Sequence, residues 1–163
     1  MSAMRDIDTA GFRHLCGHFA TGVVILTALD PNGQPAGMTA NSFTSVSLVP
    51  PFVTINVDHA AEMHAVMMRA TRWALNILES AQEPLSRRFA GNTAARFDGI
   101  GFRVDENGNV LLDGVLAAIH CEAETRFEAG DHTIFVGRVT GGVAAPGRPL
   151  LYYRGGYMTP GQP

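Results

Sequence analysis

Apolar and polar residues alternate along much of this chain of 163 residues, with the two-residue period that β-strands impose on their side chains. Turn residues interrupt the pattern: Asp30-Pro31-Asn32-Gly33 predicts a hairpin, and residues 105–109 predict a turn between short strands. We therefore expect strands at residues 23–28, 38–48, 52–57, 73–78, 117–127, 133–142 and 150–153.

Helical spacing predicts three helices, over residues 10–20, 60–70 and 80–89. In the second helix we expect Met63, Val66 and Met67 to point inward, and in the third Ser80 and Glu83 resemble a capping box. Residues 1–9 are expected to be a loose tail. Many strands and a few helices in one domain, residues 1–163, predict a mainly β (α+β) fold, an antiparallel barrel with helices covering its ends.

Composition narrows the class of protein. The chain is 46% hydrophobic and 17% charged, which is typical of a globular domain. Its net charge of -3 and the scattered arginines argue against nucleic acid as a partner. Cys16 and Cys121 lack Cys-x-x-Cys spacing, which favours reduced thiols and a cytoplasmic location, with Cys16 buried on a helix face. Neither a membrane span nor a signal peptide is predicted.

Residues 37–48 are rich in hydroxyl and amide side chains, although they are patterned like a strand. Ser45 and Ser47 are two residues apart, so both are expected on one face of that strand. Hydroxyls beside backbone N–H groups suit phosphate oxygens and the edges of heterocycles. A solvent-facing edge strand has a similar composition, so both interpretations stand on spacing alone.

Several histidines and arginines are candidates for chemistry. His132 follows Gly130-Asp131 ahead of an apolar strand, which places it at a strand entrance, either as a surface residue or in a site. Arg87 and Arg88 end a predicted helix, where a cation complements the helix dipole or binds phosphate. His14 and His18 have chelating spacing without an evident third ligand, so no metal site is expected. The remaining histidines are expected to be structural or exposed: His59, His64 and His120.

Six segments, in order along the chain, resemble the flavin reductase-like, FMN-binding split-barrel family, the reductases of two-component monooxygenases. The match runs from about Phe12 to Tyr157, and Gly-Asp-His-Thr ahead of a strand is its most specific part. The matching segments are residues 19–24, 37–48, 73–78, 87–91, 129–137 and 153–157.

The resemblance implies an antiparallel split β-barrel that binds FMN or FAD and takes its hydride from NADH or NADPH. It also implies a homodimer with the flavin near the subunit interface, and a monooxygenase partner that receives reduced flavin by diffusion. His132 would line the nicotinamide side of the flavin and serve as the catalytic residue. The cofactor-binding residues implied are Met38, Thr39, Ala40, Asn41, Ser42, Ser45, Val46, Ser47, Asn56, Val57, Asp58, Met63, Arg88, Phe89, His132, Arg154 and Tyr157.

Some of these residues also have structural interpretations. Asp58 could be the N-cap of the helix that follows it, and that helix could present its positive end to reduced flavin. Arg154 and Tyr157 could bind pyridine nucleotide, contact a dimer partner or anchor the last strand.

The chain lacks the motifs of other nucleotide enzymes. It has no Gly-x-Gly-x-x-Gly after a strand, no Walker phosphate loop and no Gly-x-Ser-x-Gly nucleophile elbow. These absences exclude a Rossmann site and fit a family in which the nicotinamide stacks on the flavin. The predicted function is NAD(P)H:flavin oxidoreductase; the alternatives are an oxidase that retains its flavin and a non-catalytic flavin- or haem-binding module.

Overall fold

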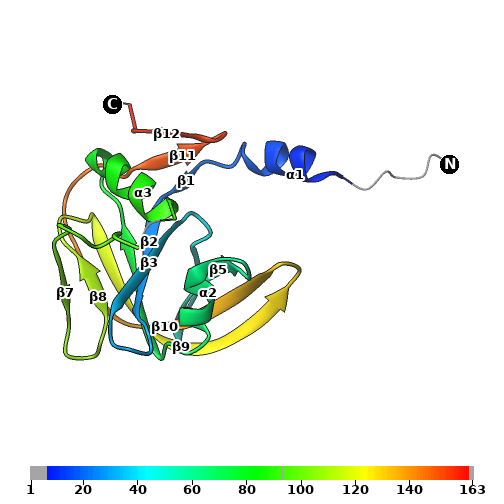
Figure 1. Cartoon of the computed structure of the whole chain (residues 1–163). Coiled ribbons are helices and arrows are strands. Elements are labelled where there is room, and N and C mark those ends of the chain that lie inside the picture. The colour runs from blue at the N-terminus through cyan, green and yellow to red at the C-terminus, as the bar shows by residue number, and fades with distance from the viewer. Residues whose placement is uncertain (1–6, 93, 162–163) are drawn as a thin grey trace.

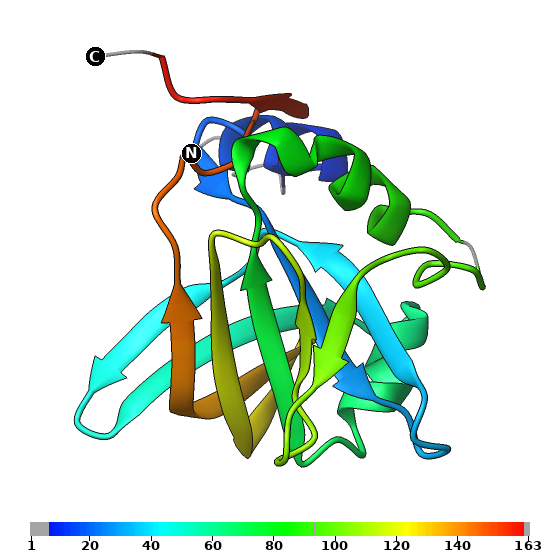
Figure 2. The same ribbon diagram turned by 90° about the vertical axis from the view of Figure 1, so that its left-hand side faces the viewer.

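The structure is a computed structural model that describes residues 7–92 and 94–161. Its main sheet contains β2 (Val24–Leu29), β3 (Pro35–Ala40), β4 (Thr44–Leu48), β5 (Pro51–Asp58), β6 (Arg72–Ile77), β9 (Ala117–Ala129) and β10 (His132–Ala144). These strands pair antiparallel in the order β3-β2-β6-β9-β10-β5-β4. The sheet is strongly curled (Figure 2), yet hydrogen bonding among the described residues leaves β3 and β4 as its two edges. The predicted mainly β, antiparallel fold is confirmed.

Smaller elements cover the ends of this curled sheet. β1 (Thr21–Gly22), β11 (Leu151–Tyr153) and β12 (Gly156–Met158) form a second sheet, and β7 (Phe102–Val104) pairs with β8 (Val110–Leu112). The helices are α1 (Thr9–Cys16), α2 (Glu62–Met67) and α3 (Glu83–Ala90), which the 3₁₀ turn η1 (Ser80–Gln82) precedes. In Figures 1 and 2, α3 and the β11–β12 hairpin lie together above one end of the sheet, and α1 extends away from the body.

The core lies inside the curl of the sheet. β5 alternates as its sequence predicts: Val53, Ile55 and Val57 are buried, while the residues between them are half-buried. Trp73 is 1% exposed and packs in the same cluster. Gly137 faces it, and a Cβ there would lie 2.3 Å from Trp73 Cζ2, so only glycine fits. Within residues 7–92 and 94–161, we find no helix that combines the length and hydropathy needed to span a membrane.

A buried asparagine joins the β7–β8 hairpin to the main sheet. Asn76 is fully buried; its Nδ2 donates to Ile25 O at 3.1 Å and to Thr27 Oγ1 at 2.9 Å. Its Oδ1 accepts from the Leu112 backbone N–H at 2.9 Å. Because both polar ends of the amide are satisfied, burying Asn76 costs little and fixes the hairpin in one position.

The prediction of one strand over residues 38–48 is wrong. The chain leaves the sheet after Ala40, the end of β3, and re-enters it at Thr44, the start of β4. β3 and β4 are therefore at opposite edges of the main sheet, and residues 41–43 connect those edges. The cause is a tertiary contact of Ser42, described below.

Other predictions were wrong in detail at the helices. Asp8 caps α1 at Thr9, so the structure begins inside the expected tail, whose residues 1–6 lie outside the described part. Cys16 is exposed, not buried. The capping box belongs to Glu79 and Gln82, one residue before the predicted pair, and the predicted strands also omitted β12.

Candidate functional site

Two adjoining hollows bring together predicted site residues from four separate segments of the chain. The first has a volume of about 340 Å³, and Gly37, Met38, Thr39, Ala60, Ala61, Glu62, Met63, Phe89, Ala90, Asn92 and Arg96 line it. The second has about 200 Å³, and Val23, Thr39, Ala40, Asn41, Ala90, Tyr152 and Tyr157 line it. Thr39 and Ala90 belong to both, so the hollows form one cleft along β3.

A close approach of α3 to β3 forms the floor of this cleft. A Cβ at Gly37 would lie 3.0 Å from Phe89 Cε1 and 3.1 Å from the Leu26 carbonyl oxygen. Glycine at position 37 therefore lets the Phe89 ring, which is 1% exposed, pack directly on the strand. The small side chains of Ala60 and Ala61 line the opposite wall. A planar ring could approach the backbone closely at the wall of Ala60 and Ala61.

Arg96 is the cation of the cleft, and sequence analysis missed it. Its guanidinium is held by Gly91 O, at 3.1 and 2.7 Å, and by Glu62 Oε2 at 2.8 Å. Its side chain is only 17% exposed, while that of Glu62 is 74% exposed. No local motif marks this residue, because it enters the site from a loop after α3.

The turn from β5 to α2 is built differently from the expectation. Ala61, not Asp58, is the N-cap of α2, and it makes no side-chain capping bond. Asp58 Oδ1 instead accepts from the Ala60 N–H at 2.8 Å and closes the turn before the helix. The Val57 side chain is buried in the core, whereas Met63 both packs in the core and lines the first hollow.

His132 lies beside this turn, at the start of β10. It pairs with Asp58 across the sheet, and His59 N–H donates to Asp131 O at 3.0 Å. His132 Nδ1 donates to Asp131 Oδ1 at 2.7 Å, and this hydrogen bond is the main reason that the pKa of Asp131 is lowered. The ring is 41% exposed, and its Nε2 is directed away from that bond. His132 does not line either hollow.

The two arginines of α3 are engaged with protein groups. Arg88 Nη2 donates to Ala95 O and Asp98 O, both at 2.5 Å, and so fixes the loop after the helix. Arg87 pairs with Glu83 at 2.6 Å and lies over the Tyr157 ring at 4.9 Å. Neither arginine lines the two hollows, so flavin phosphate binding by Arg88 stays a prediction.

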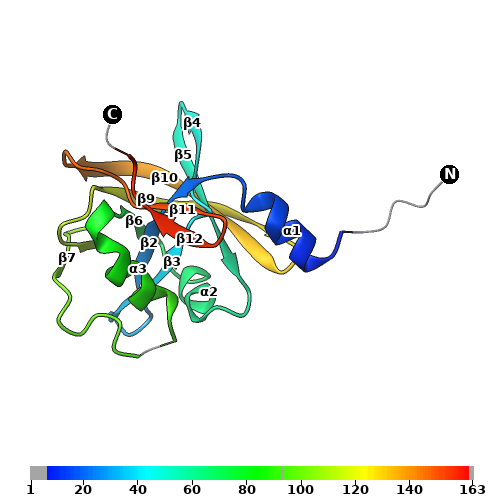
Figure 3. The same cartoon turned by 90° about the horizontal axis from the view of Figure 1, so that it is seen from above.

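Residues Ser45, Val46 and Ser47 lie away from the cleft, in β4. The β4–β5 hairpin projects from the body in Figures 2 and 3. A bulge falls between Ser45 and Ser47, so the prediction that both share one face of a regular strand does not hold. The Ser47 hydroxyl donates to Pro50 O, and Ser45 is exposed. One chain alone does not bring these hydroxyls to Met38–Asn41.

Ser42 uses its hydroxyl inside the protein. Its Oγ donates to Asn56 O at 3.0 Å and accepts from Asn56 N–H at 3.1 Å. The last ladder pair of β4 and β5 at this end joins Thr44 to Thr54, so the next backbone partner of Asn56 would have been residue 42. The Ser42 side chain replaces that partner and holds the connection between the two sheet edges against β5.

The C-terminal hairpin closes the other side of the cleft. Tyr157 lines the second hollow, whereas Arg154 lines a third, of about 320 Å³, that also involves Phe12 and Phe19 of the α1 region. Arg154 has φ 49° at the hairpin turn, and its N–H donates to Gly17 O at 3.0 Å. Arg154 therefore ties the hairpin to the end of α1.

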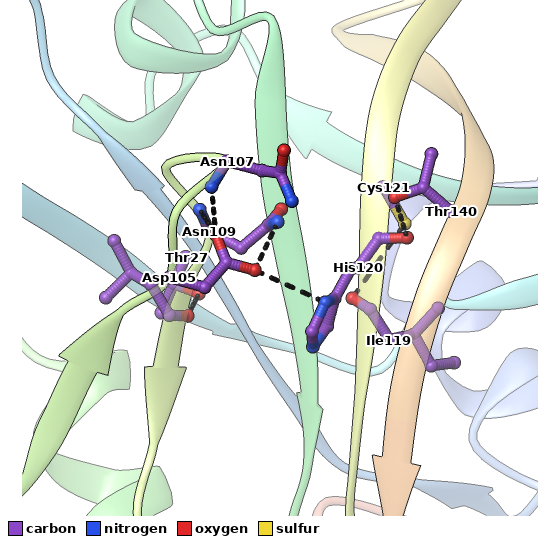
Figure 4. Close-up of polar contacts among 9 residues, drawn as sticks. Thr27, Asp105, Asn107, Asn109, Ile119, His120, Cys121 and Thr140 are labelled. Carbon is purple, nitrogen blue, oxygen red and sulfur yellow. Dashed lines mark hydrogen bonds and ion pairs between the residues drawn. The ribbon is translucent and has the colours of Figure 1, made fainter.

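A separate polar cluster surrounds His120 (Figure 4). Its Nδ1 lies 3.4 Å from Asp105 Oδ2, and Asp105 also accepts from the Asn109 side chain at 2.9 Å. Burial raises the pKa of Asp105, but hydrogen bonds from Asn109 and Asn107 outweigh it, so that pKa is lowered overall. None of these residues lines the cleft. The expected structural role of His120 fits this arrangement.

Comparisons with known proteins show the family of the chain. A family model described as "Flavin reductase like domain" matches residues 16–161. A flavin reductase of Pseudomonas putida is 40% identical over 93% of this chain and 89% of its own length. HsaB, the reductase subunit of a flavin-dependent monooxygenase of Rhodococcus jostii, is 35% identical over 95% of this chain and 80% of its own.

A solved structure shows the same fold with ligands. The NADH:FAD oxidoreductase SgcE6 of Streptomyces globisporus, in complex with NAD and FAD fragments, has a TM-score of 0.87 and 37% identity, covering 93% of this chain and 92% of that one. Some relatives are longer: the chain spans 49% and 66% of two Rhizobium meliloti proteins to which it is 40% identical.

Proposed function

The chain belongs to the flavin reductase-like family, and from that membership we propose that it is an NAD(P)H:flavin oxidoreductase whose cleft along β3 binds FMN or FAD. The observation that carries the proposal is the convergence of Met38–Asn41, Met63, Phe89 and Tyr157 on one cleft. The chemistry that a bound flavin supplies is acceptance, at N5, of a hydride from nicotinamide C4.

The chain's own residues would bind and orient the two rings. Gly37 lets Phe89 pack directly on β3, and the small side chains of Ala60 and Ala61 leave room for a planar ring in the cleft, which favours a stacked, near-attack arrangement. Arg96 lines the first hollow as an ion pair with Glu62, and its guanidinium would favour negative charge in the cleft where the flavin competes with that carboxylate. His132, with Nδ1–H committed to Asp131, offers Nε2 to the nicotinamide carboxamide at the end of β5.

The decisive experiment measures NADH and NADPH oxidation with and without added FMN or FAD. We expect oxidation that depends on added flavin, since the reduced flavin would leave for a partner monooxygenase. Oxidation independent of added flavin would favour an oxidase that retains its flavin. Flavin binding without any oxidation would favour a non-catalytic module and refute the proposal.

We also propose that the protein is a homodimer. Among the described residues of α1 none is buried, although the segment carries large apolar side chains. Leu15 is 62% exposed, and Phe19, just beyond the helix, is 79% exposed. The tip of the β4–β5 hairpin exposes Leu48 and Val49, at 86% and 93%. A second copy would cover these apolar groups and could bring the β4 hydroxyls to a cleft. Sedimentation of a fully active monomer at micromolar concentration would refute it.

A cytoplasmic location is part of the same proposal. Both cysteines are free thiols, which is typical of a reducing compartment. Fractionation of cells that produce the protein would test it, and recovery outside the cytoplasm would contradict it.

A further inference from the structure

Ser86 of α3 contacts both walls of the second hollow. The residue is fully buried, and sequence analysis did not single it out. Its carbonyl oxygen accepts from Thr39 Oγ1 on β3 at 2.6 Å. Its side-chain Oγ is hydrogen-bonded to the Tyr157 hydroxyl on β12 at 2.8 Å. One residue thus joins the strand wall and the C-terminal wall.

Besides its hydrogen bond to Ser86, Tyr157 packs against the buried cluster that includes Phe89 and Leu150, and its backbone pairs with Tyr152 on β11. Its ring packs edge-on against Tyr152 at 5.4 Å between centroids, and the Arg87 guanidinium lies over it at 4.9 Å. Arg87 is itself paired with Glu83 and its side chain is 65% exposed, so it supports the ring only weakly. The hydrogen bond to buried Ser86 is the directional contact that fixes where the Tyr157 ring lies.

We propose that Ser86 is a positioning residue for flavin binding: its hydroxyl holds Tyr157 of the β11–β12 hairpin against α3 at the mouth of the second hollow. The proposal rests on the proposed function of the cleft. Removing the hydroxyl frees the Tyr157 ring, while β11 stays paired with β1 and the Arg154 N–H stays bonded to Gly17 O. The flavin then meets a Tyr157 side chain that must be ordered upon binding. The expected effect falls on affinity, because Ser86 is buried behind the wall and does not line the hollow.

The test is a double-mutant cycle of Ser86→Ala and Tyr157→Phe, read by FMN titration with flavin fluorescence. Each single variant should raise the Kd for FMN roughly two- to tenfold, the range for one neutral hydrogen bond. The double variant should bind no more weakly than the weaker single variant, because both remove the same bond. Steady-state kinetics should show a raised KM for flavin with kcat nearly unchanged.

A control variant separates positioning from loss of stability. Ser80→Ala removes a hydroxyl from the helical turn just before α3, where it donates to Glu79 Oε1 at 2.6 Å. It should lower the melting temperature without changing the Kd for FMN. Hydrogen–deuterium exchange without flavin should speed up at residues 156–158 in Ser86→Ala and stay unchanged in Ser80→Ala.

Two results would overturn the proposal: an unchanged Kd in both single variants, or effects that multiply in the double variant. If Ser86→Ala does not fold, Tyr157→Phe alone still decides, since an unchanged Kd for FMN refutes the positioning role of the Ser86–Tyr157 hydrogen bond. Failure of the proposed function is distinguishable, because it appears as wild-type protein that binds FMN but does not oxidise NADH or NADPH.

Discussion

Replacing Ser42 by alanine tests how the connection between the two edges of the sheet is held. The substitution removes the Oγ that is hydrogen-bonded to both the N–H and the C=O of Asn56, at 3.1 and 3.0 Å. Each bond contributes about 0.5–1.5 kcal/mol net, which gives about 1–3 kcal/mol for the two. Both groups are partly buried, and water can reach them, so we expect about 1–2 kcal/mol.

The free energy of unfolding is measured by urea titration, with the fluorescence of Trp73 as the probe. Trp73 is the one tryptophan of the chain and is 1% exposed, so its emission reports loss of the core. The expected loss corresponds to a melting temperature about 2–8 °C lower, at about 2–4 °C per kcal/mol for a domain of this size. Ser45→Ala is the matched control, since Ser45 is exposed on β4 and its loss should leave stability unchanged.

The position of Ser42 in the connection also determines how Ser42→Ala should bind flavin. Affinity should fall only modestly, because the hydroxyl acts through the position of Met38–Asn41 and does not contact the ligand. If stability stays at the wild-type value while the Kd for flavin rises tenfold or more, the hydroxyl faces the ligand. The structural assignment of Ser42 would then be wrong.

Three further predictions follow from contacts elsewhere. Gly137→Ala should lower the free energy of unfolding by about 1–3 kcal/mol or more in urea titration, because its Cβ would lie 2.3 Å from the Trp73 ring. Asp105 has a lowered pKa in the folded state, so its contribution to stability should be present above pH 3.8 and should fade as the pH falls through the folded-state pKa. Asp105→Asn should therefore lose less stability in acid than the wild-type protein does. His132→Ala should raise the KM for NAD(P)H and slow reduction of bound flavin roughly two- to tenfold in stopped-flow, with little change in flavin affinity.

Each of these three variants has its own control or its own refuting result. Gly22→Ala should be tolerated, because nothing lies within 4 Å of a Cβ there; equal losses at both glycines would discount the clash with Trp73. Glu106→Gln, on the exposed part of the same turn, should leave the pH dependence unchanged. Collapsed flavin affinity with normal reduction in His132→Ala would move that histidine to the flavin site.

Local pattern predicted most of the main sheet, because alternation is a property of each strand. Val53, Ile55 and Val57 are buried where their spacing places them. The break after Ala40 was not predictable in this way, since residues 41–43 contain neither glycine nor proline and continue the hydroxyl-rich pattern. The break depends on Asn56, which is distant in sequence. Its backbone groups hydrogen-bond to the Ser42 side chain where a neighbouring strand would have paired.

The candidate site was predictable only as far as its motifs are continuous. Met38–Asn41 and Phe89 belong to the family segments, Met63 was predicted to point inward from the second helix, and the cleft contains all of them. Arg96 reaches the cleft from a loop, whereas Ser86 lies behind its wall on a buried helix face, and neither residue carries a local signal. Cys16 illustrates the opposite error: an apolar helix face predicted burial, but among the described residues α1 has no buried side chain.

The crossing at residues 41–43 has a consequence for how the protein assembles. It connects β3 and β4, which are the two edges of the sheet and are separated by five other strands. Met38–Asn41 and β4 therefore reach their places only when all the strands between them have paired. A partly folded chain would lack the cleft altogether. Ligand that binds along β3 would then select the complete fold, and its binding free energy would add to the cooperativity of unfolding as a whole. Flavin should therefore protect the β7–β8 hairpin, which does not line the cleft, from proteolysis as well.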